Sequence, residues 1–222
     1  MLQKTKKQPG QLFKQNSARS LHIKKLLALL VFVGIASYGN AQFNYGFKVI
    51  AGAGCQSDML EIANNCDMRF STGFGIVSKY QFSEGLALKS GLEYLQKGRK
   101  LERDETSLSN KLQYLNLPVK AEFSAGEKAG FKNGQRIFFA VGPYASYLLD
   151  AEGELDNVSF DLKNDTKDFD FGISFEIGIE LPVFKDNALQ LGLNYDMGFV
   201  EVYKSEPDLH NKMASIGVGL LF

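Results

Sequence analysis

The stretch Asp168–Leu181 (DFDFGISFEIGIEL) decides the fold, because large apolar residues alternate strictly with polar or small ones. Every odd position holds Phe, Ile or Leu, and every even position holds Asp, Gly, Ser or Glu. Successive side chains of a β-strand point to opposite faces of the sheet, so this segment has one apolar and one polar face. A helix would scatter the same apolar residues around its circumference. The stretch therefore predicts a long β-strand.

The same alternation recurs at seven other places, clearest at residues 189–199 and 115–123. The strands run to about 10–14 residues, longer than the 5–6 usual in soluble proteins and sufficient for a tilted strand to cross a bilayer. The pattern predicts an eight-stranded antiparallel up-and-down transmembrane β-barrel. Its expected connections are residues 55–68, 83–85, 99–110, 125–135, 149–167, 183–187 and 201–211.

Alternation alone also fits a soluble β-sandwich or a periplasmic lipocalin-like ligand binder. Three observations favour the membrane. The apolar face is nearly continuous over eight long strands, glycines accompany the charges on the polar face, and the apolar register ends on Phe222. The first, third, fifth and seventh connections are long and polar, whereas the second and sixth are short, as in outer-membrane barrels. We therefore expect the polar face to line the lumen.

Charges of both signs share that polar face. An eight-stranded barrel is only wide enough for side chains to fill it, so we expect these charges to pair and plug the lumen rather than leave a diffusion pore. The predicted lumen charges are Lys48, Lys79, Lys89, Glu93, Lys97, Lys120, Glu122, Asp168, Asp170, Glu176, Glu180 and Asp196.

Residues 1–41 resemble a signal peptide. Lys24 and Lys25 precede an apolar run over residues 26–35, and small residues at Gly39 and Ala41 suit cleavage after Ala41. A membrane anchor would need roughly 20 apolar residues, so a cleaved leader is favoured over a retained one. The sequence thus predicts a signal peptide at 1–41, a barrel at 42–222 and a location in the outer membrane of a bacterium.

Overall charge is balanced, with 25 basic and 25 acidic residues, but the leader contains seven of the basic residues and no acid. Residues 42–222 therefore contain 18 basic against 25 acidic residues. Nucleic-acid binding depends on basic neutralisation of phosphates, so an acidic barrel argues against it. The expected partners are instead outer-membrane lipid, and proteins that contact the loops or the periplasmic turns.

Cys55 and Cys66 lie in the first long connection. An exported protein meets an oxidising periplasm, so we expect a Cys55–Cys66 disulfide that restrains this loop.

Several motifs resemble the PorT-type outer-membrane β-barrel family of Bacteroidota. Residues 113–120 (QYLNLPVK) are similar to its "YLxLPVxxK" strand, residues 142–148 (GPYASYL) to its "GPY" strand, and residues 45–48 (YGFK) to its first strand. The resemblance covers residues 43–222. The family is recognised by its barrel rather than by a reaction, and its namesake serves a protein-secretion pathway linked to gliding motility. The resemblance implies a structural or protein-interaction role with a possible link to secretion.

Little in residues 42–222 indicates catalysis. A barrel-type lipid-modifying enzyme is the alternative, and it would centre on His210, which has Ser205 nearby. We interpret His210 as a solvated loop histidine. The acidic run Asp150, Glu152, Glu154 and Asp156 lacks the spacing of a calcium loop, and no nucleotide or phosphate motif occurs, so we expect no enzyme activity, cofactor or metal.

Overall fold

The computed structural model describes residues 43–58, 68–103, 106–127, 130–156, 158–184, 187–205 and 208–222. The predicted leader and its cleavage site lie outside these residues. Nearly all of the described chain is β-strand. The strands are β1 (Phe43–Ser57), β2 (Arg69–Ser83), β3 (Leu86–Arg103), β4 (Thr106–Ala125), β5 (Arg136–Leu155), β6 (Val158–Asp161), β7 (Phe169–Phe184), β8 (Asn187–Glu201) and β9 (His210–Leu221).

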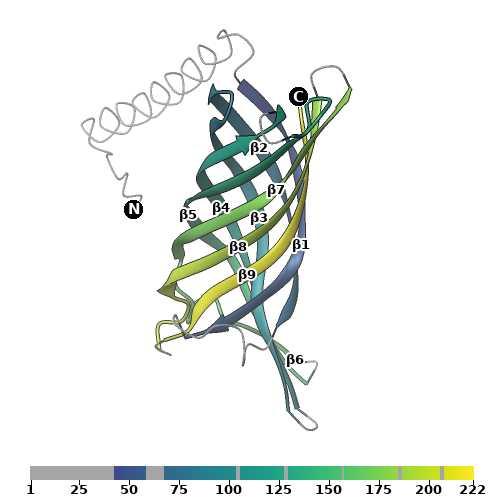
Figure 1. The fold of residues 1–222 in the computed structure, drawn as a ribbon. Coiled ribbons are helices and arrows are strands. Elements are labelled where there is room, and N and C mark those ends of the chain that lie inside the picture. Colours follow the sequence, from purple (N-terminus) through teal and green to yellow (C-terminus); the bar gives the residue numbers. More distant parts are fainter. Residues whose placement is uncertain are drawn as a thin grey trace, which may run out of the picture. The chain divides into compact units, whose positions relative to one another are not determined.

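Eight of these strands close into an antiparallel barrel (Figure 1). Each strand pairs with its neighbours in the chain, and β1 pairs with β9 from Gly46↔Leu221 to Ser57↔His210, which closes the ring. The ninth strand, β6, pairs with the end of β5 and lies outside the ring. The predicted eight-stranded barrel is confirmed. Among the described residues, no helix is long and apolar enough to span a membrane.

The barrel has two different ends. One end, called here the turn end, carries the C-terminal Phe222 and the connections that follow β2, β4 and β7. The opposite end, called the loop end, carries the connections that follow β1, β3 and β8, together with the β5–β6 hairpin that projects from the barrel in Figure 1.

The third and fifth connections are not the long loops that the sequence predicts at 99–110 and 149–167. β3 and β4 continue as a paired hairpin to Arg103↔Thr106, and β5 runs on to Leu155 before pairing back with β6. Here the outward positions hold polar residues such as Gln96, Lys100 and Ser109. Apolar–polar alternation fades where the outward face no longer meets lipid, yet the hydrogen-bond ladder continues from the wall.

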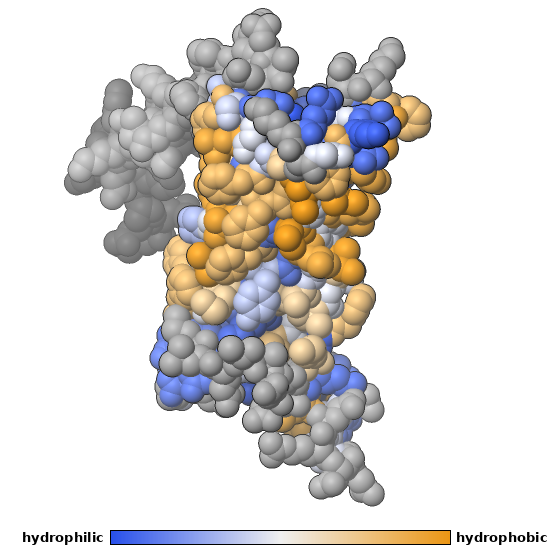
Figure 2. All heavy atoms as spheres, viewed as in Figure 1, coloured by the Kyte–Doolittle hydropathy of each residue, from blue (hydrophilic) through white to orange (hydrophobic). Residues whose placement is uncertain are grey.

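The outer face of the barrel is apolar between two aromatic girdles, and Figure 2 shows the hydrophobic band with hydrophilic residues at both ends. At the turn end the ring of Phe222 lies 6.2 Å from Tyr45 and 6.4 Å from Phe47. At the loop end Phe74 lies 5.4 Å from Tyr94, and Tyr147 lies 5.3 Å from Phe169. Such girdles are typical of barrel residues at the two lipid–water interfaces.

Candidate functional site

The interior of the barrel is filled by the inward-facing charges. Every residue of the predicted lumen set except Asp168 is buried or nearly so. Asp168 is exposed on the bend before β7, because the strand begins one residue later and the chain there already belongs to the loop end. The prediction for Asp168 is therefore wrong. The structure adds Lys212 of β9, which is also buried.

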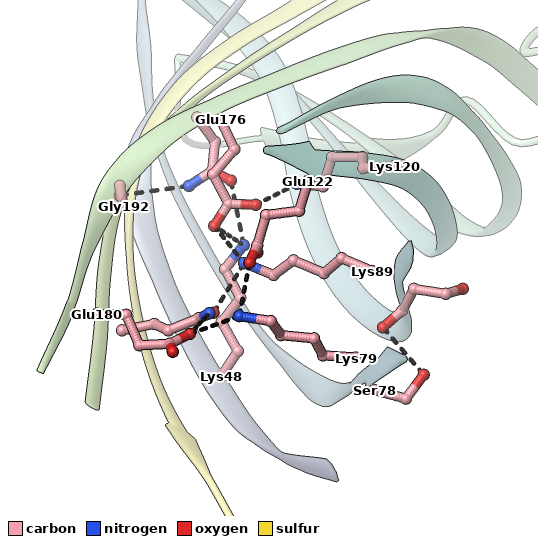
Figure 3. Close-up of polar contacts among 12 residues, drawn as sticks. Lys48, Ser78, Lys79, Lys89, Lys120, Glu122, Glu176, Glu180 and Gly192 are labelled. Atoms are coloured by element: carbon pink, nitrogen blue, oxygen red, sulfur yellow. Dashed lines mark hydrogen bonds and ion pairs between the residues drawn. The ribbon is translucent and has the colours of Figure 1, made fainter. Parts of the chain in front are cut away.

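Glu176 is the centre of the charged interior. Its carboxylate lies 2.8 Å from Lys89 Nζ, 2.5 Å from Lys120 Nζ and 3.6 Å from Lys48 Nζ (Figure 3). The three lysines come from β3, β4 and β1, whereas Glu176 comes from β7. This single carboxylate thus links strands from across the barrel.

A second group of ion pairs lies beside it. Lys79 Nζ is 2.6 Å from Glu122 and 2.7 Å from Glu180, and Glu122 is also 3.8 Å from Lys89 Nζ. Gln190 donates to Glu180 at 2.8 Å and accepts from Lys89 at 2.8 Å. Buried ions of opposite sign therefore compensate one another here, as a low-dielectric interior requires.

A third group lies nearer the loop end and is built around Asp170. Its Oδ2 accepts hydrogen bonds from Lys97 at 3.1 Å, Asn211 at 3.2 Å and Tyr144 at 3.3 Å. Lys97 Nζ also lies 4.3 Å from the centre of the Tyr144 ring, in a cation–π contact. Charged and aromatic side chains together fill this level of the lumen.

The inward glycines give these long side chains room, as the alternating pattern predicts. A Cβ at Gly217 would lie 2.4 Å from Lys48 Cε, and a Cβ at Gly172 would lie 2.7 Å from the Tyr144 ring. An internal void of only about 10 Å³ is found among Lys48, Glu93 and Asp196. That volume barely holds one water molecule.

The loop end of the lumen is covered by a lid, defined here as residues 162–168 and 202–205. Val202 and Tyr203 pack in an apolar cluster with Leu112, Tyr114 and Leu148 of the wall. The two parts of the lid are joined by backbone hydrogen bonds from Lys167 N to Val202 O and from Lys204 N to Asp165 O, both 2.8 Å. The lid therefore packs against the wall at the loop end of the barrel.

An exposed ion pair joins the lid to the wall. Lys167 Nζ lies 2.7 Å from Glu201, which is beyond the aromatic girdle at the end of β8. The hydrogen bond from Lys167 lowers the pKa of the Glu201 carboxyl below its ordinary value. This pair therefore keeps its charges into mildly acidic solution.

His210 is not the solvated loop histidine that the sequence predicts. It is the first residue of β9 and is buried, and its Nδ1 has no hydrogen-bond partner among the described residues. It pairs in the ladder with Ser57 of β1, because β9 begins before the expected strand boundary. Ser205, its expected neighbour in a catalytic pair, is exposed in the lid.

Of the acidic run, Asp150, Glu152 and Glu154 lie on the β5 extension, and Asp156 follows it in a turn. Asp150 and Glu152 bond to Gln113 and Lys111 of β4 at 3.2 and 3.5 Å. Within the ranges that the structure describes, no group of three or more His, Cys, Asp or Glu side chains is placed to hold a metal ion. Cys55 is buried near the end of β1, whereas Cys66 lies outside the described residues, so their disulfide stays a prediction.

Sequence reasoning missed the aromatic and amide groups of the lumen, chiefly Tyr144, Asn211 and Tyr203. A signal for Tyr144 was present, since it shares the inward register of Gly142 and pairs with Gly172 on β7. A large inward-facing residue that pairs with a glycine on the next strand is the pattern that indicates a lumen-filling side chain such as Tyr144. Tyr203 gave no such signal, because its position depends on how the lid folds back.

A family model and a solved structure agree with this architecture, and two further solved structures resemble it less closely. A family model described as "Outer membrane protein beta-barrel domain" matches residues 13–204. Neisserial surface protein A has a similar structure, with a TM-score of 0.50 and 12% identity over 83% of this chain and 99% of that one. The attachment invasion locus protein Ail of Yersinia pestis gives a TM-score of 0.46, 12% identity, and coverage of 82% and 100%. The outer membrane protein OprG of Pseudomonas aeruginosa gives a TM-score of 0.45 and 11% identity, over 81% of this chain and 94% of that one. No curated protein matches this chain significantly.

A closed barrel with a charged interior and an apolar outer band defines an integral membrane protein of the small outer-membrane barrel class. The chain belongs to the outer membrane protein β-barrel domain family. Its place is the outer membrane, with the apolar band in the lipid bilayer. This assignment replaces the soluble lipocalin-like alternative.

Proposed function

We propose that this protein is a non-conducting barrel that acts as a structural or interaction protein through its loop end. The observation that carries the proposal is the filled interior, where Glu176, Lys79 and Asp170 each hold several partners and the void beside Lys48 is about 10 Å³. The lid packs over the loop end above them. Such an interior supports a plug rather than a solute path, and the role is not enzymatic.

The loop end faces the cell exterior in this proposal. The even number of barrel strands puts residues 43 and 222 at one end, and a leader at 1–41 delivers the chain from the periplasmic side. Short turns lie in the periplasm and longer extensions lie outside in barrels of this class. The β3–β4 and β5–β6 hairpins would then form a rigid β-structured platform above the membrane, suited to partner contact.

We also propose that the chain is of the PorT type and serves protein secretion. The supporting motifs at 113–120 and 142–148 lie on the neighbouring strands β4 and β5, where Leu117 pairs with Ala145. The motifs thus meet in one patch of the wall. Contact with secretion components through the platform or the periplasmic turns would follow from that membership.

If the interior is filled as proposed, the barrel should not conduct ions. Purified mature protein inserted in planar lipid bilayers should give no steady conductance steps, because ion pairs fill the described interior and the lid packs over its loop end. A porin in the same membranes serves as the positive control, and heat-modifiable migration in gels verifies that the barrel is folded. Discrete steps from the folded protein would contradict the proposal.

Intact-mass analysis tests the leader and the disulfide together. Protein purified from membranes should have the mass of residues 42–222, because the signal peptidase cleaves after Ala41. A thiol-alkylating reagent should add no mass before reduction and two labels after it, because Cys55 and Cys66 are bridged. A Cys66→Ser variant, with one label and no need for reduction, is the control. Two labels on the unreduced protein would refute the bridge.

A further inference from the structure

The short strand β6 has a free edge. On one side it pairs with the end of β5, from Glu152↔Asp161 to Leu155↔Val158, and no described strand pairs with its other side. All of its residues are exposed, and the hairpin that contains it projects from the loop end of the barrel (Figure 1). Unlike the strands of the closed ring, β6 can therefore accept another strand.

The phase of the β5–β6 ladder defines which backbone groups lie on this edge. Leu162 N donates to Ala151 O at 2.9 Å, so the even-numbered residues of β6 are those that hydrogen-bond to β5. In an antiparallel pair, the N–H and C=O groups of the residues between them point the opposite way. Ser159 and Asp161 are these residues, and their backbone donors and acceptors lie on the free edge.

Among the described residues, the carboxylate of Asp161 has no cation within salt-bridge distance. Asp161 pairs directly across the ladder with Glu152, and like charges in that position are destabilising. Glu152 lies 3.5 Å from Lys111 of β4, whereas the Asp161 carboxylate accepts only the backbone N–H of Lys163, at 2.7 Å. A basic side chain on an added strand would compensate Asp161.

The other face of β6 is apolar. Leu155 and Val158, a cross-strand pair at the tip of the hairpin, are 44% and 68% exposed. The half-exposed ring of Phe160 lies so close to Gly153 of β5 that a Cβ there would be 2.4 Å from it. The hairpin extends beyond Tyr147 of the loop-end girdle, away from the apolar band (Figure 1). An exposed apolar surface outside the membrane is typical of a protein contact.

From these observations we propose that the free edge of β6 binds, by strand addition, a short extended segment of a partner protein in which apolar and basic residues alternate. The backbone of the segment hydrogen-bonds to Ser159 and Asp161. Its apolar side chains pack beside Val158 and Phe160, and its basic side chains lie beside Asp161. A second copy of β6 fits poorly, because it would bring another Asp161 to the same edge.

The inference rests on the proposed interaction role of the loop end, and it defines the chemistry of the partner for that role. The conductance test is independent of it, because β6 lies outside the ring of the barrel. Discrete conductance steps would contradict the filled interior and leave the edge of β6 unaffected. A failure of strand addition would leave the filled interior unaffected.

Peptide binding to the folded protein in nanodiscs of zwitterionic lipid tests this inference. The probe is a short capped peptide in which valine and lysine alternate. Comparison peptides have glutamate in place of lysine, the valines and lysines in two separate blocks, or a methyl group on every backbone nitrogen. We expect the valine–lysine peptide to bind and to slow amide hydrogen exchange at Ser159 and Asp161. The comparison peptides should bind at least about tenfold more weakly.

Ser159→Pro removes the N–H on the free edge and leaves the pairing with β5 in place, since proline is tolerated where the N–H of an edge strand faces solvent. It should weaken binding of the valine–lysine peptide about tenfold. Ser159→Ala is the matched control, because it keeps that N–H, and it should bind the peptide as the unchanged protein does. Asp161→Lys should reverse the preference in favour of the valine–glutamate peptide. Glu127→Lys makes the same change of charge at the turn end and should alter neither affinity.

Heat-modifiable migration verifies that each variant folds, and slow exchange of the Phe160 amide verifies that the β5–β6 hairpin is intact. Three results would each overturn the inference: no binding of the valine–lysine peptide, equal binding by Ser159→Pro and Ser159→Ala, or slowed exchange only at residues outside β6. A dimer that forms through β6 without peptide would also overturn it, because the occupant of the edge would then be a second copy.

Discussion

Replacing Glu176 by Gln should destabilise the barrel more than any other single change to the lumen. The substitution keeps the shape of the side chain but removes the charge that compensates Lys48, Lys89 and Lys120, all of which are buried. Removing one partner of a buried ion pair costs about 3–5 kcal/mol, because the other charge is left uncompensated. Here three lysines lose the same partner, so we expect a loss at the upper end of that range.

The measurement is the free energy of unfolding in urea, for protein refolded into lipid vesicles. The matched control is Glu152→Gln, which removes the same charge from the half-exposed pair with Lys111 on the β5 extension. Exposed pairs contribute little, so the control should change stability hardly at all. Equal losses in the two variants would show that the lumen network does not stabilise the barrel.

Arg in place of Ile177 should be the most damaging change to the outer face. Ile177 is midway along β7, half exposed, and paired with Leu193, which also faces outward. Arg on the lipid face costs about 2–4 kcal/mol at the bilayer midplane and about 0–1 kcal/mol near the interfaces. Phe169→Arg, on the same face of the same strand but in the loop-end girdle, should therefore be mild.

The same urea titration gives the free energy of unfolding of both variants. The difference between their two losses reports how deep each position lies in the membrane. The result requires that the apolar band is centred near Ile177 and that the girdles mark its edges. If Phe169→Arg proved as costly as Ile177→Arg, the membrane boundary assigned from the girdles would be wrong.

The barrel could be predicted because lipid imposes a strict pattern on its wall. Asp168–Leu181 alternates without exception, and all but the first residue of this stretch lie on β7 with Phe and Ile outward. Where the outward face leaves the lipid, the pattern stops. The sequence then predicts loops at 99–110 and 149–167, although strands extend over 99–103, 106–110, 149–155 and 158–161. Patterning reports the environment of a strand, whereas the hairpins are held by backbone hydrogen bonds that leave no such pattern.

The sequence could predict which residues face the lumen, but it could not predict which of them form ion pairs with one another. Alternation places Glu176 and Lys120 on the inward face, yet their contact depends on how far the strands are staggered around the ring. The predicted set includes Asp168 because alternation does not show where a strand begins; β7 starts at Phe169, and Asp168 lies on the bend before it. The lid depends on contacts between residues 162–168 and 202–205, which are far apart in the sequence and have no repeating pattern.

The position of Glu176 has a consequence for how the barrel is assembled. Its lysine partners lie on β1, β3 and β4, so no contiguous pair of strands contains the whole group. A partly formed sheet in the membrane would expose these ions to lipid or keep them hydrated by trapped water, and both states are costly. The charged groups are shielded from both lipid and water only when β1 pairs with β9 and the barrel closes. Insertion of this chain should therefore be an all-or-none event whose last step is the zipping of its two terminal strands.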